Sequence, residues 1–118
     1  MKNLLPLTLL LTSMATFAAS PTEKDLLNDA ATPGNITTYG GGYSLQRHSP
    51  LKQIDPSNVG RLVPVWNLSL ANNYPQEGQP LLIDGVMYET TTDATVALDP
   101  LTGRQLWRTP VTLPQDVH

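Results

Sequence analysis

Cysteine is absent from the 118-residue sequence, so the chain can form neither a disulfide bond nor a thiolate metal site. Histidine is scarce, and its two copies, His48 and His118, lie too far apart in sequence to predict a zinc site. Lysine and arginine together number seven, are scattered singly, and leave a formal net charge of −3. Proteins that bind nucleic acid usually carry a basic patch, so we expect no nucleic-acid partner.

A hydrophobic run long enough to span a membrane is also missing. The apolar stretch at residues 4–11 is shorter than the roughly 20 residues that a transmembrane helix needs. Lys2 precedes this stretch, and the triplet Thr16-Phe17-Ala18, small at its first and third positions, follows it as a cleavage site, which is the order found in a secretory signal peptide. We therefore interpret residues 1–18 as a signal peptide that is cleaved on export, with a retained anchor as the alternative.

Proline and glycine are plentiful, with eleven and eight copies, whereas only 14% of the residues are charged. This composition favours short strands and loops over long amphipathic helices. One short helix is expected after Thr22, because Asp25 stands three residues later as in a capping box. A second helical turn is expected at Asp55-Pro56. We call residues 19–63, which hold both turns, the entry segment.

Beyond residue 63 the hydrophobic pattern changes to a period of two. Residues 65–70, VWNLSL, place Trp66, Leu68 and Leu70 on one face and polar side chains on the other, which predicts a half-buried strand. Further along, Asp84-Gly85 separates two apolar runs and is typical of the type I′ turn of a β-hairpin. The sequence therefore predicts an all-β region over residues 64–118.

The segment 97–107, ALDPLTGRQLW, predicts a turn between two further strands of the same antiparallel sheet. Asp99 can accept hydrogen bonds from residues two and three positions later, and Thr102 can add a side-chain bond within the loop. Gly103 is expected in the left-handed conformation that closes the turn. A tryptophan at a fixed distance after a rigid turn suits a side chain that docks on a neighbouring sheet, and we assign this role to Trp107.

These residues carry a resemblance to a known family. The pattern Ala97-x-Asp99-x-x-Thr102-Gly103-x-x-x-Trp107 resembles the tryptophan-docking repeat of the quinoprotein β-propellers. Upstream, YGGGYSLQRHSPLKQIDPSNVGRLVPVWNLSL followed by QEGQPLLIDGVMY resembles the start of the pyrroloquinoline-quinone (PQQ)-dependent alcohol dehydrogenases. The likeness covers roughly residues 25 to 110.

The resemblance implies a partial eight-bladed β-propeller: the first blade, preceded by a strand at residues 65–70 that closes the ring by joining the last blade. It also implies a periplasmic enzyme that oxidises primary alcohols to aldehydes. In such an enzyme PQQ lies beside a calcium or lanthanide ion, an aspartate acts as general base, and electrons pass to a cytochrome c. The family's general base and metal ligands match no residue of this chain, so we assign no catalytic or metal-binding residue and expect the chain to be a truncated piece, inactive and without cofactor when alone.

One residue can be assigned a role at the cofactor. Glu77, in the loop at residues 75–80, matches the glutamate of the family's Glu-x-x-Pro segment, which contacts PQQ. Because PQQ carries three carboxylates, a glutamate beside it requires a shared proton, an intervening cation or other compensation. The alternative is a solvated loop carboxylate. We call residues 75–80 the glutamate loop.

Two other interpretations are open at the sequence level. The chain could belong to a non-enzymatic quinoprotein-repeat propeller, an outer-membrane assembly or binding module, or it could be a small exported β domain that folds alone. Glu77 and the long entry segment favour the enzyme, because the scaffold families lack such a segment. A domain that folds alone would unfold cooperatively, whereas a single blade would expose strand edges and aggregate.

Overall fold

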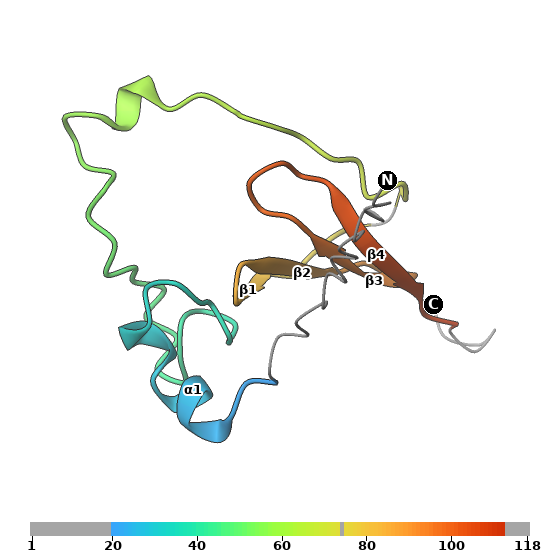
Figure 1. The fold of residues 1–118 in the computed structure, drawn as a ribbon, viewed down its shortest axis with the longest axis horizontal. Coiled ribbons are helices and arrows are strands. Elements are labelled where there is room, and N and C mark those ends of the chain that lie inside the picture. The colour runs from blue at the N-terminus through green and yellow to red at the C-terminus, as the bar shows by residue number, and fades with distance from the viewer. Residues whose placement is uncertain (1–19, 74, 113–118) are drawn as a thin grey trace, which may run out of the picture.

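The computed structural model describes residues 20–73 and 75–112. Its centre is one antiparallel sheet of four strands in the order β1-β2-β3-β4 (Figure 1). The strands are β1 (Leu81–Ile83), β2 (Val86–Thr90), β3 (Ala94–Leu98) and β4 (Gln105–Pro110). The sequence-based prediction of a four-stranded antiparallel sheet joined by tight turns is confirmed.

The predicted type I′ hairpin joins β1 to β2. Asp84 and Gly85 both have positive φ angles, 49° and 77°, as this turn requires. The register pairs Ile83 with Val86 and Leu81 with Tyr88. The local dipeptide therefore sets which side chains of the two strands share a face.

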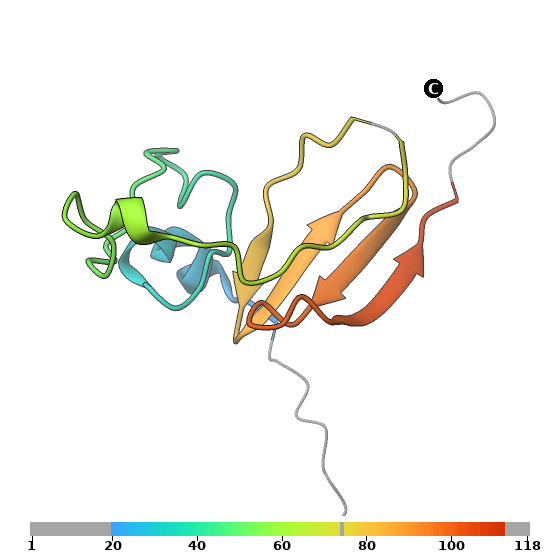
Figure 2. The same ribbon diagram turned by 90° about the horizontal axis from the view of Figure 1, so that it is seen from above.

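Strand β3 is the buried centre of the sheet. Ala94, Val96, Ala97 and Leu98 are each at most 4% exposed, whereas every residue of β4 is exposed. Seen from above, the sheet forms a single layer, with β4 at one edge (Figure 2). One face and one edge of the sheet are thus left open to a neighbour.

The turn between β3 and β4 forms as predicted, and we call residues 99–103 the docking turn. The Asp99 carboxylate accepts hydrogen bonds from the Leu101 N–H at 2.9 Å and the Thr102 hydroxyl at 2.7 Å. These bonds, that of Thr102 first, lower the pKa of Asp99. Gly103 has a φ of 71° and its N–H donates to the Asp99 carbonyl at 2.8 Å.

The entry segment contains the two expected helical turns. Helix α1 (Glu23–Leu27) begins with the predicted capping box: the Thr22 hydroxyl accepts from the Asp25 N–H, and the Asp25 carboxylate accepts from the Thr22 N–H. A 3₁₀ turn, η1 (Asp29–Ala31), follows directly. The second expected turn is η2 (Val59–Arg61), which begins four residues after Asp55, whose carboxylate accepts from the Ser57 N–H.

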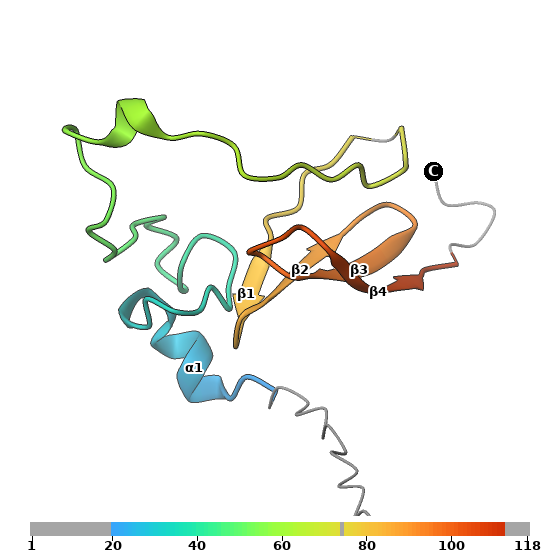
Figure 3. The ribbon, with the colours of Figure 1, turned by 45° about the horizontal axis from the view of Figure 1, so that its top comes forward.

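The strand expected at residues 65–70 is not formed. The segment is assigned to no strand, and Val65 is 83% exposed. A strand needs a partner for its backbone N–H and C=O groups, and none of the four strands pairs with this segment. Instead it crosses over the turn between β3 and β4 as an extended connection (Figure 3). The propeller interpretation gave it a partner in a different sheet.

The signal peptide expected at residues 1–18 lies outside the described residues. Within residues 20–73 and 75–112, no helix has the length and apolar character needed to cross a membrane.

Candidate functional site

The glutamate loop leads directly into β1, at an outer edge of the sheet. Glu77 is exposed on this loop, in line with its position between two chain segments without secondary structure. The site predicted from sequence is therefore a carboxylate at the entrance of the first strand, accessible to a ligand.

Beneath the loop lies a second carboxyl group that the sequence did not point to. Glu89 of β2 is only 8% exposed, and its Oε2 atom has no hydrogen-bond partner among the described residues. Burial raises the pKa of this carboxyl. Gly78 lies directly against it: a Cβ added at Gly78 would lie 2.9 Å from Oε1 of Glu89 and 3.4 Å from the Thr90 carbonyl oxygen. A side chain at position 78 would require the Glu89 carboxyl to shift.

The other side of the loop is fixed to the entry segment. Oε1 of Gln79 accepts a hydrogen bond from the Gly40 N–H at 3.0 Å. Gly40 in turn has a φ of 80° and its carbonyl accepts the Arg47 N–H at 2.8 Å. The Arg47 guanidinium lies 5.1 Å from the centre of the Tyr39 ring. The run of three glycines is thus an ordered loop that contacts the glutamate loop.

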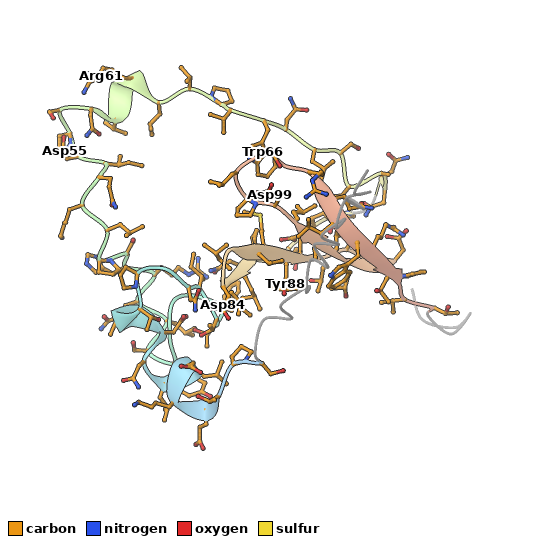
Figure 4. All side chains as sticks on the ribbon, in the orientation of Figure 1. Asp55, Arg61, Trp66, Asp84, Tyr88 and Asp99 are labelled. Carbon is orange, nitrogen blue, oxygen red and sulfur yellow. The ribbon has the colours of Figure 1, made fainter. Side chains whose placement is uncertain are left out.

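The entry segment also extends the sheet by one bridge. Ile36 pairs with Leu82 of β1 through two backbone hydrogen bonds of 2.7 and 2.9 Å. Next to it, the Asn35 side chain accepts from the Asp84 N–H at 3.0 Å, so the hairpin turn is fixed as well. Figure 4 shows Asp84 at the end of the sheet that faces the entry segment. The β1 edge is therefore covered rather than free.

A buried carboxylate holds this part of the entry segment together. Asp29, 4% exposed, accepts hydrogen bonds from the backbone N–H and hydroxyl groups of Thr37 and Thr38, at 2.6 to 3.0 Å. Burial alone would raise the pKa of Asp29, but the four hydrogen bonds outweigh it and the pKa is lowered. Asp29 is thus a structural anion that orders the chain just before Gly40.

A cavity of about 260 Å³ lies between the entry segment and β1. Its lining includes Ile36, Gly40, Arg47, Gln79 and Leu82, and Glu77 is not among them. The cavity therefore lies beside Gln79 and the entry segment, and the predicted site residue Glu77 lies outside it.

A second contact joins distant parts of the chain at the docking turn. The indole N–H of Trp66 donates to the Pro100 carbonyl at 2.9 Å, and its ring lies so close to Gly103 that an added Cβ would be 2.6 Å away. Figure 4 shows Trp66 beside the turn that holds Asp99. Trp107, by contrast, is 43% exposed and lies 6.0 Å from the Tyr88 ring, centre to centre. Its docking on a neighbouring sheet stays a prediction.

The described residues offer no group of three or more His, Asp or Glu side chains close enough to hold a metal ion. For PQQ, the chain offers an exposed carboxylate at Glu77 on a fixed loop, which fits one contact of a larger site. The buried Glu89 carboxyl and the Gln79 contact were missed in the sequence, because neither belongs to a recognisable motif. A charged residue at the end of a strand is ordinarily expected at the surface.

Comparison with protein families places residues 37–117 in a model described as the PQQ glucose/ethanol/alcohol dehydrogenase β-propeller domain. Among curated proteins, the dehydrogenase subunit of the quinone alcohol dehydrogenase of Komagataeibacter europaeus is 57% identical over 76 residues, which is 64% of this chain and 10% of that subunit. The 1-butanol dehydrogenase (quinone) of Thauera butanivorans is 42% identical over 100 residues, 82% of this chain and 16% of that enzyme.

Among solved structures, the quinohemoprotein alcohol dehydrogenase ADHIIG of Pseudomonas putida HK5 superposes with a TM-score of 0.73 at 37% identity. The match covers 80% of this chain and 14% of that structure. The chain therefore spans between 10% and 16% of the length of these three relatives.

Proposed function

Because the chain belongs to the family of PQQ-dependent glucose/ethanol/alcohol dehydrogenase β-propeller domains, we propose that it forms the first blade of an exported, periplasmic enzyme that oxidises primary alcohols to aldehydes. In this enzyme the glutamate loop contacts PQQ through Glu77, and a cytochrome c accepts the electrons. The chain by itself is inactive, because the general base and the ligands of a calcium or lanthanide ion belong to other blades.

The single observation that carries this proposal is the match of residues 37–117 to the dehydrogenase propeller family. The fixed position of the glutamate loop supports the role given to Glu77. Gly78 rests on β2, and Gln79 is hydrogen-bonded to the entry segment, so the residue just before them has little freedom. A binding group contributes most when its position is set before the ligand arrives. An exposed surface carboxylate without a role would not need a loop held on two sides.

The chemistry of the site divides between the cofactor and the chain. PQQ would supply a quinone that can accept the two electrons and two protons lost when an alcohol becomes an aldehyde. Glu77 binds and orients the cofactor, which brings its own carboxylates close to this side chain. Such a contact is favourable when Glu77 shares a proton with the cofactor or faces a cation, and the exposed loop allows either.

The role of Glu77 can be tested by a single substitution in an enzyme that has all the blades of the propeller. We define the graft as the Pseudomonas putida HK5 quinohemoprotein alcohol dehydrogenase in which residues 20–112 of this chain replace the matching N-terminal segment. Glu77→Gln in the graft should speed the loss of PQQ about tenfold, the usual effect of losing one hydrogen bond to a charged group. PQQ release after gel filtration is measured by absorbance.

The matched control is Glu23→Gln, which removes a carboxylate from α1 without touching the glutamate loop. Equal PQQ loss from the Glu77→Gln and Glu23→Gln grafts would refute the assignment of Glu77.

A further inference from the structure

Gln79 joins two parts of the chain that are far apart in sequence. Its side-chain oxygen accepts the Gly40 N–H at 3.0 Å, across 39 residues. The bond is partly buried, and Gln79 itself is half-buried. A partly buried hydrogen bond restricts both of its ends more than a solvent-exposed one does.

The Gly40 end of this bond is itself rigidly held. A Cβ at Gly40 would lie 3.0 Å from the Leu45 side chain, and its φ of 80° is a conformation that other residues rarely adopt. Its carbonyl accepts the Arg47 N–H, and the Asp29 carboxylate fixes Thr37 and Thr38 just before it. The backbone position of Gly40 is therefore restrained by its own contacts.

The glutamate loop has a second contact, between Gly78 and strand β2. Gly78 lies against β2: a Cβ added there would be 2.9 Å from Oε1 of Glu89 and 3.4 Å from the Thr90 carbonyl oxygen. Glu77 precedes these two held residues directly. Loss of either hold would let the backbone at Glu77 move.

We propose that Gln79 is a positioning residue for Glu77: through its hydrogen bond to Gly40, the entry segment sets where the Glu77 carboxylate meets the cofactor. This inference rests on the proposed function for its effect on PQQ, but its structural part can be tested without any cofactor. The entry segment then serves the cofactor site by fixing the glutamate loop.

The first test uses the graft without PQQ and measures amide hydrogen exchange. Gln79→Met removes the acceptor at similar size and should speed exchange at Gly40 about fivefold. The backbone order parameter of Glu77, measured by NMR relaxation, should fall as this residue becomes more mobile. Gln79→Glu keeps an acceptor oxygen and should retain the exchange rates of the unaltered graft. The control Gln105→Met, on the exposed strand β4, should leave both amides unchanged.

The second test is a double-mutant cycle in the graft. Gln79→Met should speed PQQ loss when Glu77 is present and should add nothing in the Glu77→Gln background, because its effect passes through Glu77. A general loss of stability would instead add its full effect in both backgrounds.

An unchanged order parameter at Glu77 in Gln79→Met, or additive effects on PQQ loss, would overturn the positioning role. If Glu77→Gln alone leaves PQQ retention intact, the proposed function fails, and the exchange and relaxation data still decide whether Gln79 holds the loop. If Glu77→Gln weakens retention and Gln79→Met does not, the function stands and the positioning role is refuted.

Discussion

Single residues show where local sequence rules succeed and where they do not. Asp84 and Gly85 adopt the two positive φ angles that their types favour, so this turn could be predicted without knowing anything beyond its neighbours. Glu89 could not be predicted, because its burial depends on Gly78, which packs against it from a loop eleven residues earlier. Gln79 could not be predicted either, because its partner is the backbone N–H of Gly40, and every residue except proline has such a group. The role of Glu77 at the cofactor was inferred only from its likeness to a family motif.

The buried carboxyl of Glu89 makes the stability of the chain depend on pH. Its pKa is raised by burial above the ordinary value of 4.5, so the folded state binds a proton more tightly than the unfolded state. Its contribution to stability is therefore greatest below pH 4.5 and decreases as the pH rises through the folded pKa. Glu89→Gln removes the ionisation and should raise the free energy of unfolding at pH 7 by about 1 kcal/mol.

Urea unfolding of the graft and of its Glu89→Gln variant between pH 4 and pH 7 measures this effect. We expect the difference in stability to grow with pH, and a matched Glu23→Gln variant, altered at an exposed position of α1, to show no such trend. A constant difference across this range would mean that Glu89 keeps the same protonation in both states.

The elements differ in how far they depend on distant contacts. Strands β1 to β4 are joined by short turns with strong residue preferences, and the capping box that starts α1 is likewise local, so both could be predicted from sequence. The segment 65–70 has the alternation of a strand, yet it forms none, since alternation indicates a face to bury and supplies no pairing partner. The contact of Trp66 with Pro100 spans 34 residues and was not foreseen.

The packing of Trp66 against the docking turn can be tested by a substitution at Gly103. Gly103→Ala places a Cβ 2.6 Å from the Trp66 ring at a φ of 71°, so the indole must leave and the turn becomes strained. We expect the free energy of unfolding of the graft to fall by about 2 kcal/mol. The left-handed backbone strain and the lost packing of Trp66 both contribute to this decrease. Trp66 fluorescence should shift to longer wavelength as its ring meets water.

Gly60→Ala is the matched control, because an added Cβ at Gly60 meets nothing within 4 Å. If the two alanine variants unfold at the same urea concentration, Trp66 does not pack on the docking turn in solution.

The whole molecule has the features of a part that requires neighbours. Among the described residues, the buried apolar side chains all belong to β3, while Trp107 and all of β4 are exposed. A single four-stranded blade with an open face buries too little apolar surface to complete a core, and repeat folds reach a continuous core with about three units. The sequence showed this organisation through the docking repeat, and the superposition on a much longer dehydrogenase agrees with it.

The most direct measurement is the PQQ content of the graft beside that of the isolated 118-residue chain, with alcohol-dependent dye reduction as the second readout. We expect the graft to bind about one equivalent of PQQ and to oxidise a primary alcohol, and the isolated chain to do neither. A folded graft without PQQ would contradict the role of this chain as the first blade of a quinoprotein alcohol dehydrogenase. An isolated chain that unfolds cooperatively and binds a ligand by itself would contradict it equally.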